Sequence, residues 1–340
     1  MAIFSSTQPP RAVDGLSGET VYLAELEKVQ IIAPGVVFDA VSEVFYFNDK
    51  HMVGEEKRYG VVYQSDTYSL INSNEQSVSL SHGIFLGSGV DFLYYESIVY
   101  FVSKLDYLIG LDLAFNKNFI LNEDMSPRSK QYFADLLAKL FPNCRVFFAS
   151  GNMVITVDKL VIIGIDASKI DRNIPRIKQF IVESFPKSNH FPQDVKIMLR
   201  RKALVHYDLK WRKPINFMLL ELIARLLGFK LIDPADLELN EVAELFGRAK
   251  KVVSYHGGAL SNILFCPFGV TIIELYSTWY DDCFKKICEA TNLVYVGKSF
   301  QMYTFPSIPR TIYGLLHFRF KIVQIKHWYV PLNAFLRLIK

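Results

Sequence analysis

Between residues 195 and 296 the chain alternates short apolar runs with longer amphipathic segments, and this alternation constrains the fold more than any other feature. The apolar runs predict strands at 195–199, 230–232, 251–255, 271–276 and 294–296. The segments between them predict helices at 214–227, 240–249, 259–264 and 281–290. Strands that alternate with helices at this spacing are typical of a parallel, doubly wound sheet. We therefore predict an α/β domain over residues 195–300.

The first 185 residues predict a second α/β domain with a different order of elements. Up to about residue 80, apolar and polar residues alternate with the period of two that is typical of strands. The segments that follow predict helices at 92–108, 126–141 and 171–185, and strands at 118–121, 144–149 and 153–163. A polar stretch with two prolines, residues 185–194, predicts the linker between the domains.

The composition is that of a folded protein, which we expect in the cytoplasm. Of the 340 residues 51% are hydrophobic, which excludes a disordered chain. The first residues lack the basic and apolar blocks of a signal peptide, and no apolar run is long enough to span a membrane. The cysteines form no CxxC pair and no metal-ligand spacing, which favours a reducing compartment. They are Cys144, Cys266, Cys283 and Cys288.

Positive charge gathers at the end of the chain, although the net charge of +4 is too small to indicate a nucleic-acid partner. From Thr291 to Lys340 there are seven Lys or Arg residues and no Asp or Glu. The tail, residues 301–340, mixes these cations with aromatic and aliphatic residues, a composition that suits the inner face of an anionic plasma membrane. The alternative is a final helix that packs back on the domain, since Pro331 interrupts any continuous amphipathic stretch.

The strongest candidate for a ligand site is the loop after the predicted strand 251–255. Ligands of open α/β sheets bind beyond the carboxyl ends of the strands. Two glycines let the backbone approach a ligand closely, and the helix that follows presents N–H groups to an anion such as a diphosphate. The alternative is a tight turn in which the histidine caps a helix or bonds the backbone. The residues concerned are His256, Gly257, Gly258, Ala259 and Asn262.

A cluster of basic residues follows the predicted strand 195–199. It includes Arg200, Arg201 and Arg212, and the planar fork of arginine binds phosphate through two hydrogen bonds. The alternative is a solvated basic loop.

A carboxylate, Glu274, lies near the end of the apolar strand 271–276. Burying a carboxylate is costly unless it has a partner. A ribose diol, an arginine or backbone N–H groups could each supply that partner.

Several catalytic motifs are absent from the sequence. There is no GxGxxG, no P-loop, no Asp-x-Asp and no GxSxG. Their absence argues against a dinucleotide fingerprint, a P-loop nucleotide site, a metal-chelating nucleotide-sugar site and a serine nucleophile at a strand-to-helix turn.

Taken in order, the motifs between Leu199 and Tyr276 resemble glycosyltransferase family 61. They are Arg200-Arg201 at a strand end, Gly228-Phe229 before a short strand, the loop from His256 to Asn262, the turn Pro267–Gly269 and the strand that ends in Glu274. The chain departs from the family in two places. Arg212-Lys213 is only the nearest equivalent of a basic pair before the first helix, and residues 92–96 lack the histidine of a motif found in many members.

The resemblance implies a GT-B-like architecture, in which two Rossmann-like domains face each other across a cleft. It implies an inverting enzyme that needs no metal or other cofactor and moves a sugar from a nucleotide-sugar donor, a UDP-sugar first among them. The acceptor would be a glycan or lipid-linked glycan in capsular or other surface polysaccharide synthesis. Arg200, Arg201, Arg212 and the helix end at Gly258–Ala259 would bind the diphosphate. His256 would touch the diphosphate or the sugar, Asn262 would brace the loop and Glu274 would hold the ribose.

On this scheme the catalytic base comes from the N-terminal, acceptor-side domain, residues 1–185. The candidates are Glu96, Asp91 and His82, with Glu96 first because it begins a predicted helix. Asp91 could instead cap that helix, and His82 could be a turn residue beside Gly83. The alternative function is a catalytically inert subunit that binds a nucleotide sugar or serves as a scaffold. A third possibility is an interaction protein without a nucleotide site.

Overall fold

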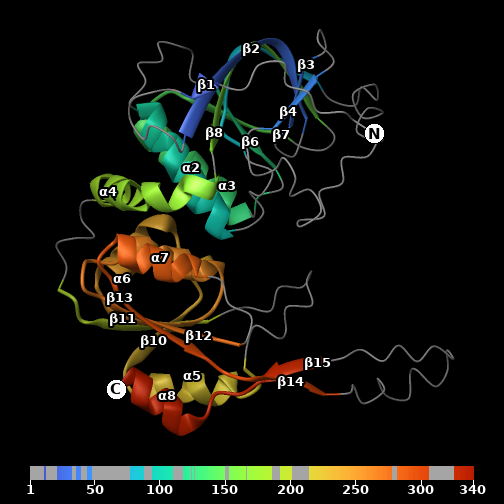
Figure 1. Cartoon of the computed structure of the whole chain (residues 1–340). Coiled ribbons are helices and arrows are strands. Elements are labelled where there is room, and N and C mark those ends of the chain that lie inside the picture. The colour runs from blue at the N-terminus through green and yellow to red at the C-terminus, as the bar shows by residue number, and fades with distance from the viewer. Residues whose placement is uncertain are drawn as a thin grey trace, which may run out of the picture. The chain divides into compact units, whose positions relative to one another are not determined.

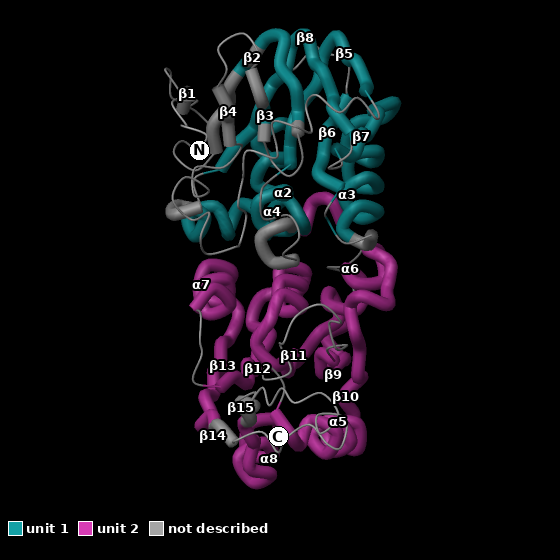
Figure 2. Tube along the Cα trace, turned by 90° about the vertical axis from the view of Figure 1, so that its right-hand side faces the viewer, with its two compact units in different colours: residues 1–181 teal, residues 182–340 magenta. Residues whose placement is uncertain are grey.

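A computed structural model of the chain divides into two compact units, residues 1–181 and 182–340 (Figures 1 and 2). The structure describes residues 11–12, 21–32, 36–39, 44–47, 77–87, 94–109, 118–123, 125, 127–149, 153–165, 167–185, 192–200, 214–277, 282–305 and 325–340.

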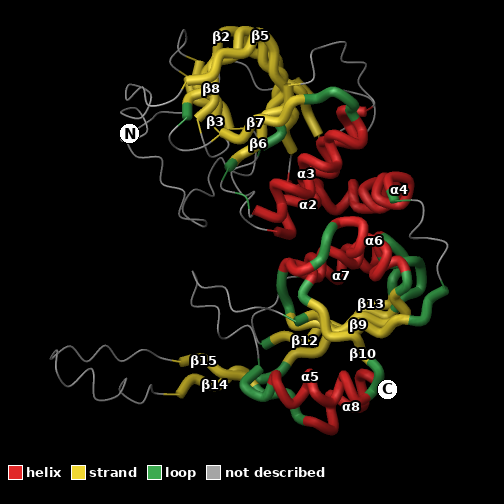
Figure 3. Tube along the Cα trace, turned by 180° about the vertical axis from the view of Figure 1, so that it is seen from behind, coloured by secondary structure: helices red, strands yellow, loops and turns green. Residues whose placement is uncertain are grey.

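The first unit is built on one mixed sheet, with strand order β4-β3-β2-β8-β5-β6-β7 and β1 paired to β2. Neighbours from β8 to β7 run parallel, whereas β2, β3 and β4 join antiparallel. The strands of this sheet curve round strongly (Figure 3). They are β1 (Arg11–Ala12), β2 (Val21–Ile32), β3 (Val36–Asp39), β4 (Val44–Phe47), β5 (Ser77–Phe85), β6 (Asn118–Asn122), β7 (Arg145–Ala149) and β8 (Val154–Ile165).

Helices connect the parallel strands of this unit. The helical segments are α2 (Tyr94–Ile109), α3 (Pro127–Leu140), the 3₁₀ helix η2 (Ala167–Asn173) and α4 (Ile174–Ser184). The aromatic rings of Phe101 in α2 and Phe133 in α3 stack with 3.9 Å between their centroids, so the two helices pack against each other.

The second unit contains a five-stranded parallel sheet in the order β10-β9-β11-β12-β13. Counted from its first strand, this order is 2-1-3-4-5, one of the two common doubly wound arrangements. The structure thus confirms the predicted α/β class and the parallel sheet. The strands are β9 (Val195–Leu199), β10 (Phe229–Ile232), β11 (Ala249–Tyr255), β12 (Thr271–Tyr276) and β13 (Val294–Ser299).

Helices cover both faces of this sheet: α6 and α7 lie on one face, and α5 and α8 on the other (Figures 1 and 3). A right-handed crossover places its helix on a face of the sheet that depends on the direction in which the chain moves across the sheet. Helix α5 leads to β10 on one side of β9, whereas α6 leads to β11 on the other side, so the two helices lie on opposite faces. The remaining elements are α5 (Phe217–Leu226), η5 (Pro234–Asp236), α6 (Leu239–Gly247), η6 (Gly258–Phe265), α7 (Cys283–Ala290), α8 (Leu332–Ile339) and a two-stranded pair, β14 (Met302–Phe305) and β15 (Ile325–Trp328).

The end of the chain packs back on the second unit, which was one of the two readings left open by its sequence. Trp328 and Phe335 are fully buried on the α5 side of the sheet. The indole of Trp328 lies edge-on to Tyr255 and stacks on Phe300. A membrane contact through residues 301–340 stays a prediction, and residues 306–324 lie outside the described ranges. Among the helices that the structure describes, none is both long and apolar enough to cross a membrane.

We predict that the change Phe335→Ala lowers the free energy of unfolding by about 3–5 kcal/mol, because it opens a cavity in a closed core. The control is Arg337→Ala, an exposed position of the same helix, for which we expect a change within about 0.5 kcal/mol. Urea unfolding followed by tryptophan fluorescence measures both. Equal midpoints for the two variants would mean that α8 does not complete the core.

Candidate functional site

The strand order of the second unit reverses between β9 and β11, and this reversal marks the candidate ligand site. From β9 the chain passes to β10 on one side, whereas β11 lies on the other. In doubly wound sheets ligands bind at the carboxyl ends of the strands at this switch point. Arg200 directly follows β9 and His256 directly follows β11, so the topology brings both predicted donor-binding positions to it.

His256 is held by three contacts at this edge and is 7% exposed. Its backbone N–H donates to the carbonyl of Leu275 at 2.9 Å. Its Nδ1 lies 2.5 Å from Oε1 of Glu274. The imidazole also packs edge-on against the ring of Phe284, with 5.4 Å between centroids. The ring therefore has a fixed orientation.

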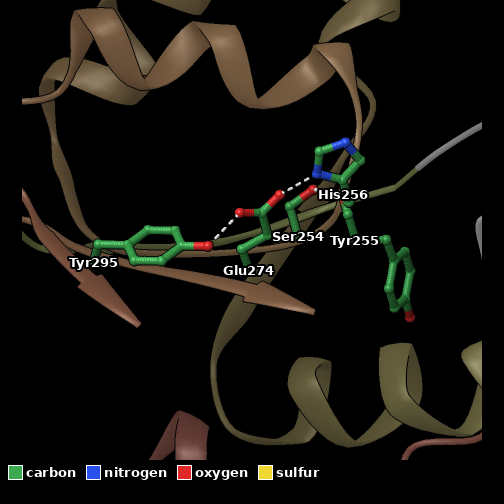
Figure 4. Close-up of polar contacts among 5 residues, drawn as sticks. All are labelled: Ser254, Tyr255, His256, Glu274 and Tyr295. Carbon is green, nitrogen blue, oxygen red and sulfur yellow. Dashed lines mark hydrogen bonds and ion pairs between the residues drawn. The ribbon is translucent and has the colours of Figure 1, made fainter. Parts of the chain in front are cut away.

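Glu274 is completely buried, and both of its carboxylate oxygens are engaged (Figure 4). Oε1 contacts His256, and Oε2 accepts a hydrogen bond from the hydroxyl of Tyr295 at 2.7 Å. The three residues come from the end of β11, from β12 and from β13, which lie side by side. The histidine and tyrosine thus supply the partners that a buried carboxylate needs. The expected role of Glu274 in holding a ribose stays a prediction.

Sequence reasoning missed Tyr295, which depends on the register of two parallel strands. Glu274 lies opposite Gly297, and Tyr295 precedes that glycine by two residues. A Cβ on Gly297 would lie 2.5 Å from the hydroxyl of Tyr295. The glycine therefore leaves the space through which the tyrosine reaches the carboxylate. The sequence offers one signal for this contact: Tyr295 lies in the predicted strand 294–296, and Gly297 follows that strand directly.

The loop after His256 is braced by its own side chains. Gly257 has φ 156° and ψ 164°, a backbone region that is open essentially to glycine alone. The hydroxyl of Ser261 donates to the carbonyl of Gly258 at 2.7 Å, and Nδ2 of Asn262 donates to that of Ala259 at 2.8 Å. Side chains that bond the backbone in this way favour short, tight turns over the α-helix. The helix predicted at 259–264 is accordingly a 3₁₀ helix, η6.

Arg200 is half-exposed and anchored beside the switch point. Its Nε donates to Oε2 of the buried Glu221 at 3.1 Å, and its backbone N–H bonds the carbonyl of Ile232. Arg201 and Arg212 lie outside the described residues.

Tyr255, one residue before His256, points to the opposite side of the sheet, toward α5 (Figure 4). Burial raises the pKa of its hydroxyl, and the nearby carboxylate of Glu221 raises it further. Tyr255 therefore stays protonated and belongs to the core.

The sequence model of Glycosyltransferase 61 matches residues 89–273, more than half of the chain. The chain belongs to glycosyltransferase family 61. The match includes Arg200 and the loop from His256 to Asn262, and it ends one residue before Glu274. A comparison with functionally curated proteins returned no match. Membership of family 61 indicates a glycosyltransferase, which takes a sugar from a donor to an acceptor.

Of the three base candidates in this family 61 chain, the structure describes one side chain. His82 is half-buried in the interior of β5, and its Nδ1 lies 3.2 Å from the hydroxyl of Ser81. The turn that we considered for His82 is therefore wrong, because β5 continues through Gly83, where a Cβ would meet Ile120. Asp91 lies outside the described residues. Glu96 lies in the first turn of α2, and its side chain is likewise outside them.

Sequence reasoning also missed Lys104, a fully buried cation in the first unit. Its Nζ donates to the carbonyls of Leu86 and Gly87 at 3.1 Å each, where the chain leaves β5. A single lysine within the apolar face of the predicted helix 92–108 was the available signal. Lys104 holds the start of the loop that leads to Asp91.

Among the described residues no group of three or more His, Cys, Asp or Glu side chains could hold a metal ion. The expected independence from metal ions stays a prediction.

We predict that Tyr295→Phe lowers the free energy of unfolding by about 1–3 kcal/mol, because it removes one of two donors from a buried carboxylate. Tyr329→Phe, at an exposed tyrosine of the same unit, is the control and should change it by less than about 0.5 kcal/mol. Urea unfolding measures the difference. If the two variants are equally stable, the hydroxyl of Tyr295 does not support Glu274.

Proposed function

We propose that this family 61 glycosyltransferase is an inverting enzyme that moves a sugar from a nucleotide-sugar donor, first of all a UDP-sugar, to a glycan acceptor. We propose surface polysaccharide synthesis in the cytoplasm as its setting. The observation that carries the proposal is the position of Arg200 and His256, which follow neighbouring strands at the switch point of a parallel sheet.

The donor diphosphate is the part of the substrate that this edge of the sheet suits best. A guanidinium group binds phosphate oxygens with charge-assisted hydrogen bonds, and Arg200, Arg201 and Arg212 are the cations that follow β9. Gly257 and Gly258 have no side chain to keep a ligand away from the backbone. The arginines that follow β9 and the loop that follows β11 would hold the diphosphate from two sides.

We assign Glu274 a positioning role in this site. Both of its oxygens bind within the protein and none of its surface is exposed, so direct contact with a ribose would require those bonds to break. The carboxyl group instead fixes which way the ring of His256 faces. His256 would then touch the donor while Glu274 acts through it.

The proposed chemistry is a single displacement at the anomeric carbon. The acceptor hydroxyl oxygen forms the new bond to that carbon while the bond from carbon to diphosphate oxygen breaks, which inverts the configuration. A base accepts the hydroxyl proton, and the diphosphate leaves with the electron pair of the broken bond. We propose that arginine side chains, rather than a metal ion, stabilise the leaving group. The base would come from residues 1–185, with Glu96 as first choice, in a GT-B arrangement.

We expect UDP to bind the wild-type protein, and Arg201→Ala and His256→Ala each to weaken binding about 10- to 100-fold, as loss of a charge-assisted hydrogen bond implies. Arg248→Ala is the matched control. This arginine pairs with Asp194, and its carbonyl accepts from Val195 at the start of β9, the opposite edge of the sheet. Isothermal titration calorimetry with UDP, GDP, CMP and TDP measures the constants. If none of these binds the wild type, the donor site is misplaced.

We expect Glu96→Gln to lower kcat about 10²- to 10⁴-fold and to leave the affinity for UDP unchanged, because it removes a base and not a donor contact. Asp135→Asn, at an exposed carboxylate of α3, is the control. Nucleotide release in the presence of glycan acceptors measures turnover. Full activity of Glu96→Gln would mean that Glu96 is not the base, and Asp91 and His82 would then be the remaining candidates. Donor binding without release on any acceptor would favour the inert subunit.

A further inference from the structure

Helix α5 is apolar on its outer side as well as on its inner side. Leu220 and Ala224 face the sheet and are completely buried. On the other side Met218 and Leu226 are 72% and 76% exposed. The exposed apolar residues of this segment are Ile215, Met218, Leu219, Leu222 and Leu226.

The spacing of these five residues places them on one stripe. Ile215, Met218, Leu222 and Leu226 follow each other by three or four positions, and Leu219 lies four after Ile215 and three before Leu222, which is the repeat of one helix face. A surface helix ordinarily carries polar residues on its outer side, and an apolar outer side indicates that something covers it.

A tyrosine extends the stripe beyond the helix. The backbone N–H of Ile215 donates to the carbonyl of Trp328, and Nδ2 of Asn216 donates to that of Val330. These bonds fix Tyr329, which is exposed, beside the start of α5. Six of the nine large apolar residues that are exposed in the described part of the chain thus belong to one surface. We call it the α5 surface: the five residues of the stripe and Tyr329.

The exposed charged side chains of α5 and α8, both described by the structure, are all cationic. Arg225 is exposed next to Leu226, whereas Glu221, the one acidic residue of α5, is buried and paired with Arg200. Helix α8 packs beside α5 and exposes Arg337 and Lys340, with no acidic residue in its sequence.

This combination of apolar and cationic groups decides between two possible occupants. A two-fold contact with a second copy of the chain brings the same patch to itself, and so would place arginine against arginine. An anionic bilayer instead takes apolar side chains among its acyl chains and cations at its headgroups, and tyrosine rings suit the boundary between the two.

We propose that the α5 surface, with Arg225, Arg337 and Lys340, docks the protein on an anionic lipid surface. This differs from a contact made by the tail alone, because the apolar side of α8 is buried in the core and α5 supplies the residues that enter the lipid. The proposal does not depend on the transferase function.

The test is co-sedimentation of the full chain with vesicles of phosphatidylcholine, alone or mixed with phosphatidylglycerol. The variant M218Q/L222Q/L226Q removes the centre of the stripe, and F268Q changes an equally exposed apolar residue away from it. We expect the wild type and F268Q to bind only the mixed vesicles, and the triple variant to bind them about tenfold or more weakly. Thermal melting and UDP binding should be the same in all three, because the stripe touches neither the core nor the donor site.

A second variant, R225Q/R337Q, separates the charges from the apolar residues. It should also weaken binding to mixed vesicles and should reduce the sensitivity of that binding to salt. Failure of the wild type to bind mixed vesicles would overturn the proposal, as would equal binding by wild type and triple variant. A third outcome is a dimer of the wild type, detected by light scattering, that the triple variant does not form, together with no binding to vesicles. That outcome would assign the α5 surface to a second copy instead.

Discussion

The geometry of the candidate site depends on one buried carboxylate. Glu274 has no contact with solvent, and this polar group is tolerated in the core because His256 and Tyr295 both bind it. The same bonds that satisfy the carboxylate hold the imidazole at the end of β11, where the strand order reverses. Stability and site geometry therefore rest on the same three side chains, and a change in any one of them affects both.

The two faces of the parallel sheet in the second unit carry different kinds of side chain. Successive side chains of a strand point to opposite faces of the sheet, so the side chains of Tyr255 and His256 point to opposite faces at the end of β11. His256, Glu274 and Tyr295 form a polar group on the side of α7, against Phe284. Tyr255 belongs to the apolar core beneath α5 and α8, and the outer side of α5 carries the exposed stripe. The candidate ligand site and the proposed docking surface therefore use different residues of the second unit.

Sequence reasoning predicts most where a local pattern determines the structure. The strand 195–199 has the predicted bounds, and the positions of Arg200 and His256 after their strands follow from the alternation of strands and helices. The 3₁₀ form of η6 was missed because Ser261 and Asn262 bond the backbone of their own turn, which an apolar pattern does not reveal. Tyr295 was missed because its contact depends on which residues two parallel strands place opposite each other. Lys104 was missed because an isolated lysine in an apolar helix does not reveal which carbonyls it will reach.

The late position of Trp328 and Phe335 in the chain affects how the second unit forms during synthesis. Strands β9 to β13 and their helices are all complete before residue 300, yet these two side chains supply part of the core on the face that α5 covers. Until α8 has been synthesised, Met198, Tyr255 and Leu275 have cover from α5 but none from α8, and part of this apolar face is exposed. The second unit therefore completes its apolar core only when the end of the chain has been made, and until then the unfinished chain exposes apolar surface that favours aggregation.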